Sequence, residues 1–207
     1  MARSEQKPYP DRLIDQSSPR ALKAPGNPAL ISLSNAMVFG YDIIMNAVPS
    51  IERILIRDLQ TLKRELSAYA NEADIWVIPK GVANSAGTLA LHLTGNISHF
   101  IGAVIGENGY VRNRDAEFSH VAVARQDLNA RIEVAIQSVE DGLSKINDLD
   151  LEKPYPILLG EIQLTIGQFL THLAAHFAYH LGQIDYHRRS VTGSIETVGA
   201  QNIAELT

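Results

Sequence analysis

Hydrophobic residues recur at helical spacing in four separate stretches of the chain, and no stretch alternates polar and apolar residues over the length of a strand. The first covers about residues 50–70, where apolar positions follow one another at steps of three and four: Ile51, Leu55, Leu59, Leu62 and Leu66. Ser50 suits an N-cap, and Pro49 suits the end of whatever precedes it. This pattern predicts an amphipathic helix.

The second and third stretches carry the same signal. The second covers about residues 85–105, starts from a capping Asn84 or Ser85 and ends before Gly106. Its apolar face is expected to consist of Leu93, Ile97, Phe100 and Val104. The third covers about residues 125–146, with apolar positions at Leu128, Ile132, Ala135, Val139, Leu143 and Ile146. Both ranges are therefore predicted to be helices.

The fourth stretch covers about residues 165–190, with Arg188 and Arg189 near its C-terminus, where cations suit the helix dipole, and Gly193 as a stop. Three long loops separate the helices, at residues 71–87, 107–119 and 147–163. The first is long enough to contribute to the wall of a site. Four amphipathic helices predict an all-α four-helix bundle, and the long connections permit a topology other than up-down-up-down.

The N-terminal part of the chain has a different character. Residues 1–36 are rich in proline, serine and charge, and they lack the apolar segment of a secretory signal. They are expected to form a poorly ordered extension. The bundle domain is expected to span residues 37–207, with Met37 as a candidate native start and an apolar, ambiguous stretch at 37–48.

Composition narrows the functional classes. The chain of 207 residues is 45% hydrophobic and 20% charged, as in ordinary globular proteins, and no apolar run reaches the roughly 18 residues of a membrane span. A net charge of −5 argues against a general nucleic-acid binder, which needs a basic face. With no cysteine, a metal site must use histidine, carboxylate or water ligands, and a cytoplasmic location is compatible.

The histidines of the fourth helix share one stripe. At about 100° per residue, His172, His176, His180, Gln183 and His187 fall within about 80° of one another. This stripe borders the apolar face of the same helix. The side chains are therefore expected at the edge of the core rather than directed straight into water.

The second helix has a matching stripe of His92, Asn96 and His99. Histidines at i and i+4, such as His176 and His180, lie close enough on one side of a helix to hold one ion. His92 is the best candidate for a third ligand, and a catalytic ion would keep an open position for water or substrate. The pattern alone leaves a second interpretation open, in which the histidines are only a polar stripe beside the core.

Other types of site find less support. A carboxylate di-metal bundle needs Glu-x-x-His motifs on its helices, whereas the single such motif, Glu117 to His120, falls in a loop. The chain has no His-Glu-x-x-His, no Gly-x-Ser-x-Gly and no phosphate-binding loop. Arg112, Arg114 and Asp115 in the same loop are expected to form a surface salt-bridge cluster.

The segment HLTGNISHF, followed downstream by HFAYHLGQIDYHRR, resembles the DinB-like superfamily of four-helix-bundle proteins, and the resemblance spans about residues 50–189. Its most specific part is the His-x-x-x-His of His176 and His180, followed by Gly-Gln. The resemblance implies a three-histidine site for a divalent ion, commonly Zn²⁺ or Ni²⁺, with His92, His176 and His180 as ligands. Many members carry His or Arg near the position of Leu181, so this chain departs there.

The resemblance also implies a function. Known activities of the superfamily include thiol-dependent isomerases and S-transferases that use mycothiol, bacillithiol or glutathione, and many members have no assigned reaction. Its members are often homodimers. We therefore expect metal-dependent transfer of a low-molecular-weight thiol to a small electrophile. Because the chain has no cysteine, the nucleophile must come from outside the protein. A metal-dependent hydrolase and a non-catalytic metal-binding stress-response bundle are the alternatives.

Four further polar side chains are expected to support the ligands or line a substrate pocket, namely Asn96, His99, His172 and Gln183. The alternative for Asn96 and Gln183 is hydrogen bonding between helices, and for the two histidines it is partial exposure to solvent. His187 is expected at the surface or in a dimer contact.

Overall fold

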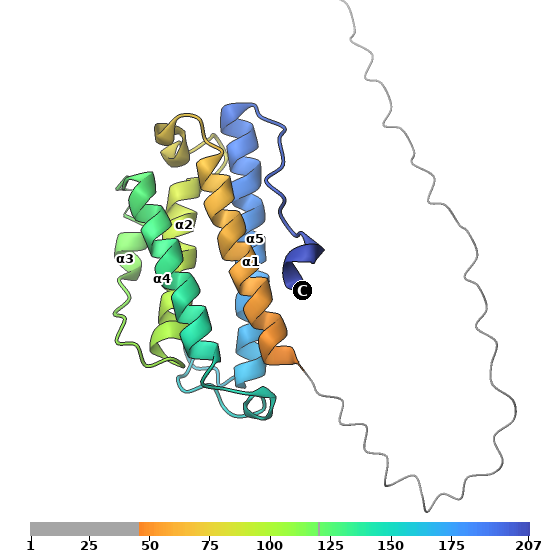
Figure 1. Ribbon diagram of the computed structural model, residues 1–207. Helices are drawn as coiled ribbons and strands as arrows, with labels where there is room; N and C mark the ends of the chain where they lie inside the picture. Colours follow the sequence, from red (N-terminus) through yellow and green to blue (C-terminus); the bar gives the residue numbers. More distant parts are fainter. Residues whose placement is uncertain (1–45, 120) are drawn as a thin grey trace, which may run out of the picture. The chain divides into compact units, whose positions relative to one another are not determined.

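The computed structural model describes residues 46–119 and 121–207, and this part of the chain forms an all-α bundle (Figure 1). Its four long helices are α1 (Ala47–Ser67), α2 (Ala86–Ile97), α4 (Arg125–Leu143) and α5 (Ile166–Thr192). The predicted all-α four-helix bundle is therefore confirmed, and the described residues contain no β-strand. The expected extension at 1–36 and the domain boundary at Met37 lie outside the described residues.

Shorter elements join the long helices. A π-helix, η2 (Ser98–Ala103), continues α2 directly. The other short elements are η1 (Glu72–Trp76), α3 (Arg114–Glu117), η3 (Asp148–Asp150) and, after α5, η4 (Ile203–Leu206). The loop predicted at 107–119 thus contains one turn of helix, α3, which its sequence pattern did not indicate.

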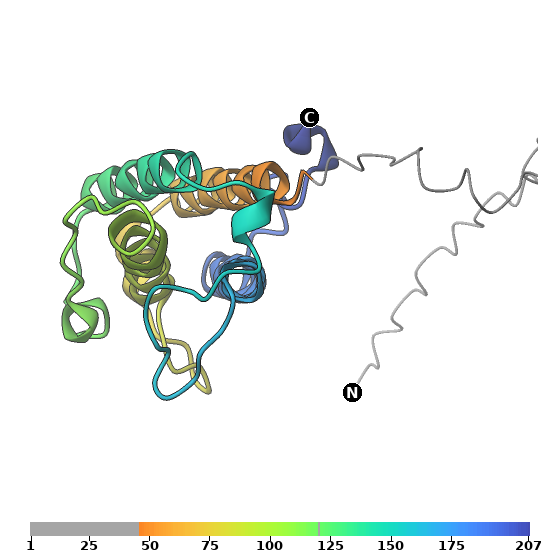
Figure 2. The ribbon, with the colours of Figure 1, turned by 90° about the horizontal axis from the view of Figure 1, so that it is seen from below.

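The consecutive helices α1 and α2 lie diagonally across the bundle (Figure 2), since each packs against both α4 and α5. α5 runs parallel to α1: Arg188, near the C-terminal end of α5, pairs with Glu65, near the C-terminal end of α1. α2 and α4 also run in one direction, as Figure 1 shows. The connection between them must therefore return along the bundle, so the topology is not up-down-up-down.

The helix ends follow local signals in most places. Ser85 caps α2 by accepting the N–H of Thr88, Thr165 forms a capping box at the start of α5, and Gly193 ends α5 in the left-handed conformation at φ 73°. α1 begins at Ala47 rather than near residue 50, because the carboxylate of Asp148 accepts the first two backbone N–H groups of the helix. This cap comes from a residue far away in sequence, which local patterns do not reveal.

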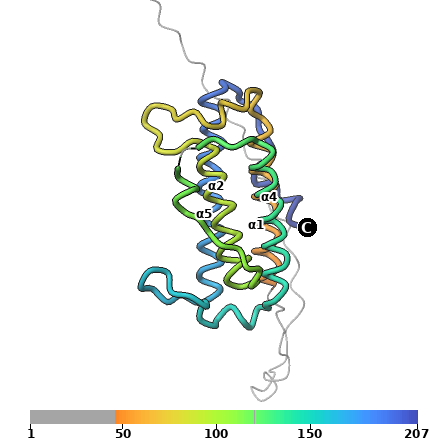
Figure 3. Tube along the Cα trace, turned by 90° about the vertical axis from the view of Figure 1, so that its left-hand side faces the viewer, coloured from red at the N-terminus to blue at the C-terminus, as the bar shows by residue number. Residues whose placement is uncertain are grey.

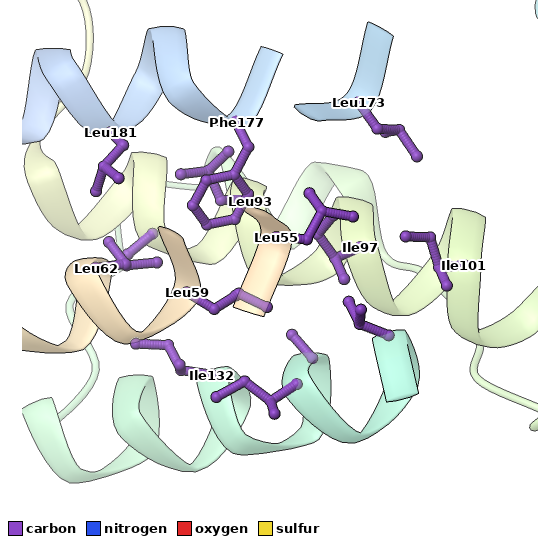
Figure 4. Packing of buried hydrophobic residues seen from close by; sticks show 14 of the residues in the cluster. Leu55, Leu59, Leu62, Leu93, Ile97, Ile101, Ile132, Leu173, Phe177 and Leu181 are labelled. Atoms are coloured by element: carbon purple, nitrogen blue, oxygen red, sulfur yellow. The ribbon is translucent and has the colours of Figure 1, made fainter. Parts of the chain in front are cut away.

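The apolar faces of the four helices meet in one core (Figure 4). The buried residues include Leu55, Leu59, Leu62 and Leu66 of α1, Leu93 and Ile97 of α2, Ile132 and Val139 of α4, and Leu173, Phe177 and Leu181 of α5. Leu181, where the chain departs from the family pattern, is thus a core residue. Among the described helices, none combines the length and apolarity needed to cross a membrane.

The π-helix corrects the predicted apolar face of the second helix. In η2 the N–H of Val104 bonds to the carbonyl of His99, five residues back, so each turn of the helix takes more residues here than in a regular α-helix. Ile101 is consequently the buried residue, whereas Phe100 and Val104 are only partly buried. Phe100 and Val104 still pack against the core, as predicted, but the prediction missed Ile101 because it assumed a constant 3.6-residue period.

Two loops extend from the same side of the bundle, beyond α2 and α5 (Figure 3). One follows η1 and covers residues 77–85, and the other precedes α5 and covers residues 154–164. Backbone bonds between Tyr155 and Leu164 and between Leu159 and Ile162 hold the second loop in a hairpin-like form. The stretch of α2 and α5 between these loops carries most of the predicted site residues.

Candidate metal centre

Three histidines from two neighbouring helices converge on one point. His92 of α2 and His176 and His180 of α5 each offer a ring nitrogen, and these atoms all lie within 4.8 Å of one another. The Nε2 atoms of His92 and His176 are 3.4 Å apart. A tetrahedral ion with Zn–N bonds of 2.0–2.1 Å requires a nitrogen–nitrogen separation of about 3.3 Å. The donor set therefore fits one divalent ion with little adjustment.

The ring of His92 is oriented by a buried carboxylate. Its Nδ1 lies 3.1 Å from Oε2 of Glu117, a side chain only 7% exposed. The Nε and Nη2 atoms of Arg112 each donate to Glu117 at 2.7 Å, which keeps the carboxylate in place. A proton on Nδ1 of His92 is thus bonded to an acceptor, and the lone pair of Nε2 faces the other two histidines.

Gly95 of α2 has no side chain, and this leaves room for the carboxylate of Glu117. A Cβ atom on Gly95 of α2 would lie 2.3 Å from Oε1 of Glu117. The one-turn helix α3 positions Glu117, and Asn113 caps α3 by accepting the N–H of Ala116. Gly95 therefore permits the close approach of α3 to α2.

Arg112 was predicted to belong to a surface salt-bridge cluster in the loop at 107–119, and this prediction was wrong. Arg114 and Asp115 are exposed, but Arg112 is paired with buried Glu117 and also lies over the ring of Phe100, 5.6 Å from its centroid. Glu117 was missed as a site residue because its sequence neighbours show no helical pattern. The Glu-x-x-His spacing drew attention to it, yet its contact is with His92, 25 residues earlier.

His180 has an acceptor of its own. Its Nδ1 lies 2.6 Å from Oε1 of Gln183, one turn later on α5. If Nδ1 carries the proton, the lone pair of Nε2 is free to coordinate an ion. Gln183 thus contacts a predicted ligand, as the stripe indicated.

The other predicted pocket residues surround the three histidines unevenly. Asn96 is nearest, with Nδ2 at 3.5 Å from Nε2 of His92, and its Oδ1 is buried without a hydrogen-bond partner among the described residues. The ring of exposed His172 lies 5.9 Å from that of His176. His99 lies on η2 against Phe100, further from the cluster, with ring centroids 4.8 Å apart.

Burial favours the neutral form of the two histidines on α5, because it lowers the pKa of each. Burial lowers the pKa of His176 to about 4, and the neighbouring His180 and His92 act in the same direction. Burial also lowers the pKa of His180. Burial alone would raise the pKa of Glu117, but hydrogen bonds from Arg112 and His92 outweigh it and lower that pKa. At neutral pH the site therefore combines an ionised acceptor with uncharged imidazoles on α5, as metal binding requires.

One cavity adjoins the cluster, and a second lies beside Gln183 on α5. One, of about 380 Å³, reaches His176 and Asn96 and is walled by the 154–164 loop. The other, of about 530 Å³, is walled by the loop at 79–84 and by Gln183 and His187 of α5, but by none of the three histidines. His176 and His180 are themselves partly exposed, so the cluster is open on one side.

The expectation for His187 was wrong. This side chain is 5% exposed, accepts at Nδ1 from the hydroxyl of Tyr69 and donates from Nε2 to the carbonyl of Val77, both at 2.7 Å. It holds the loop after η1 against α5. The helical wheel placed His187 correctly on the stripe, but burial comes from a segment 110 residues away.

Comparison with known proteins gives one match. A family model described as "Protein of unknown function (DUF1572)" matches residues 47–196, which include all four long helices and the three converging histidines. The searches of curated proteins and of solved structures returned no significant match. Since the family model covers well over half of the sequence, the chain belongs to this family, the proteins of unknown function DUF1572.

Proposed function

We propose that the protein is a metal-dependent enzyme that binds one divalent ion through His92, His176 and His180 and transfers a low-molecular-weight thiol to a small electrophile. The observation that carries the proposal is the convergence of three ring nitrogens within 4.8 Å, with oxygen acceptors at Nδ1 of two of the rings. A polar stripe that served only packing would not need acceptors that direct Nε2 inward.

The residues of the chain would supply binding and orientation. Glu117 holds the proton of His92 at Nδ1, and Gln183 does the same for His180. Three imidazoles suit Zn²⁺ and Ni²⁺. A divalent ion held by neutral ligands keeps its positive charge and acidifies a thiol or water at its free position. The partial exposure of His176 and His180 leaves room for such a molecule.

Three observations support a thiol transferase over a simple metal store. The sequence resembles the DinB-like superfamily, whose known members use low-molecular-weight thiols. The chain has no cysteine, so a sulfur nucleophile must be a second molecule. The cavity that reaches His176 gives a small molecule a place next to the proposed ion. The same resemblance leads us to expect a homodimer, and the absence of cysteine is compatible with a location in the cytoplasm.

The proposal is tested with the full-length chain loaded with Zn²⁺ or Ni²⁺. Monochlorobimane is offered as the electrophile together with glutathione, bacillithiol or mycothiol, and conjugate formation is followed by fluorescence. At least one thiol is expected to react faster than in the absence of protein. His176→Ala is expected to lose this activity together with the metal, while His99→Ala, a histidine outside the cluster, is expected to keep the metal.

Each negative result has a distinct meaning. Hydrolysis of ester substrates without any thiol reaction would replace the transferase by a hydrolase at the same site. Metal binding with four protein ligands and no turnover would indicate a non-catalytic bundle. Absence of bound metal by elemental analysis, with unchanged stability of His176→Ala, would overturn the metal centre itself.

A further inference from the structure

We propose that the cavity of about 380 Å³ beside His176 binds the electrophilic substrate, and that this substrate is a small ring-bearing apolar molecule with one hydrogen-bond donor. The donor would bond to Oδ1 of Asn96, and the ring would lie between α5 and the 154–164 loop. The role as a substrate pocket rests on the proposed function, whereas the binding of such a molecule does not.

The size and walls of the cavity indicate the class of ligand. A volume of about 380 Å³ is near the lower end for small-molecule sites, which run from about 300 to 1,000 Å³. Six of its lining side chains are apolar: Phe100, Leu159, Ile162, Leu164, Phe169 and Leu173. A compact apolar molecule therefore fits better than an extended or highly charged one.

The aromatic part of the wall is fixed before any ligand binds. Phe100 and Phe169 meet edge to face with ring centroids 4.9 Å apart, and Tyr155 lies 4.4 Å from Phe169. The hydroxyl of Tyr155 donates to the carbonyl of Phe100 at 2.6 Å. This bond joins the 154–164 loop to the π-helix, so the two sides of the cavity hold a set spacing. Aromatic edges and faces favour another ring as the occupant.

Asn96 supplies the polar end of the cavity. Its side chain is 7% exposed, and Oδ1 has no hydrogen-bond partner among the described residues. In the metal-free protein the orientation of the amide follows from His92, since a proton on Nδ1 bonded to Glu117 leaves Nε2 as an acceptor 3.5 Å from Nδ2 of Asn96. Oδ1 is thus left for another donor, and a buried acceptor without one is unfavourable.

The two ends of the cavity set the direction of the ligand. Asn96 and His176 are at the end next to the three-histidine cluster, whereas Ile162, 61% exposed, belongs to the loop at the outer side. A ligand with its donor at Asn96 would place its polar end beside the cluster and its apolar end against the loop.

The test compares p-cresol with 4-methylanisole, in which a methyl group replaces the hydroxyl hydrogen, so that only p-cresol can donate a hydrogen bond. Dissociation constants are measured by ligand-observed NMR with the full chain, both loaded with Zn²⁺ and after chelation, so that bonding of the phenol to metal is separated from bonding to Asn96. The chelated protein is expected to bind p-cresol about tenfold more tightly than it binds 4-methylanisole. Asn96→Leu is expected to remove this difference.

A pair of loop variants tests the location of the ligand and does not depend on the buried Asn96. Ile162→Trp is expected to weaken both probes at least about tenfold by filling the cavity. Leu158→Trp is the matched control, since Leu158 is 58% exposed in the same loop but does not line the cavity. Equal affinities for the two probes, or equal effects of the two variants, would overturn the proposal.

Failure of this inference is distinguishable from failure of the proposed function. Selective binding of p-cresol with no turnover by any thiol leaves the pocket in place and removes the reaction. Turnover with no selective binding, unaffected by Ile162→Trp, keeps the reaction and places the electrophile elsewhere.

Discussion

Two buried clusters in this bundle each pair an arginine with a glutamate, and they differ in how completely the carboxylate is bonded. Where α3 meets α2, Arg112 donates to both oxygens of Glu117, and His92 is a third partner. Where α5 meets α1, Arg188 donates to one oxygen of Glu65, and the other oxygen has no partner among the described residues.

The pKa values of the two glutamates move in opposite directions as a result. Burial raises the pKa of Glu65, and the hydrogen bond from Arg188 offsets this only in part. At Glu117 the bonds from Arg112 and His92 outweigh burial and lower the pKa. A fully bonded carboxylate can serve as a constant acceptor beside an open site, whereas the incompletely bonded one is closed off and joins α1 to α5.

The largest effect is expected from breaking the closed pair. Arg188→Met leaves Glu65 in the core without a counter-charge, and the free energy of unfolding should fall by about 3–5 kcal/mol. Urea unfolding at neutral pH measures the loss. The double variant Glu65→Leu/Arg188→Met should recover most of it, because no charge remains buried. A double variant as unstable as the single one would contradict this account of the pair.

The second effect separates the two clusters by function. Glu117→Gln should lower the affinity for Zn²⁺ by about 10–100-fold, because the acceptor for Nδ1 of His92 loses its charge. Competition with a chromophoric chelator measures the affinity. Asp185→Asn removes a carboxylate bonded to Arg188 in the other cluster and should leave Zn²⁺ affinity unchanged. If both variants weakened binding alike, a general loss of structure would be the cause.

Two glycines of the bundle differ in the room that they leave for an added methyl group. Gly95→Ala would place a methyl group 2.3 Å from Glu117 and should cost about 1–3 kcal/mol of stability, along with part of the Zn²⁺ affinity. Gly182→Ala on α5 meets nothing within 4 Å and should stabilise the helix by about 0.5–1 kcal/mol. Thermal unfolding of both variants checks the difference in sign, and a stabilised Gly95→Ala would rule out the close approach of α3.

The smallest effect concerns pH. The folded pKa of Glu65 is raised, so its contribution to stability falls as pH rises from the ordinary carboxyl pKa, about 4.3, through the raised value. Within this window the slope should stay below about 1.4 kcal/mol per pH unit. Urea unfolding at several pH values should show a flatter profile for Glu65→Leu/Arg188→Met than for the wild type. Parallel profiles would mean that Glu65 does not titrate in this window.

Local periodicity was sufficient to predict the four helices. The leucines of α1 and the apolar positions of α4 are spaced by helix geometry alone, and the capping signals at Ser85, Thr165 and Gly193 act on their own neighbours. The start of α1 was missed because its cap is the distant carboxylate of Asp148. The π-helix was missed because no residue type marks a change of period.

The part of the site that lies on a single helix, α5, was predictable from the sequence. His176 and His180 share a face by their spacing, and the matching stripe on the second helix, together with the resemblance, pointed to His92. The bond from Glu117 to His92 and the burial of His187 beneath Val77 depend on how distant segments fold back, which a single sequence does not state. The metal and the reaction stay proposals, since the family match carries no assigned activity.

The parallel arrangement of α2 and α4 has a consequence for how the protein can change in evolution. A plain up-down bundle would join neighbouring helices by short turns, and no segment would travel past the middle of α2. Here the returning segment at 104–124 delivers Glu117 to the cluster from outside the bundle, on a separate piece of chain. Exchange of this segment between relatives could therefore retune the centre while the helices that support it stay as they are.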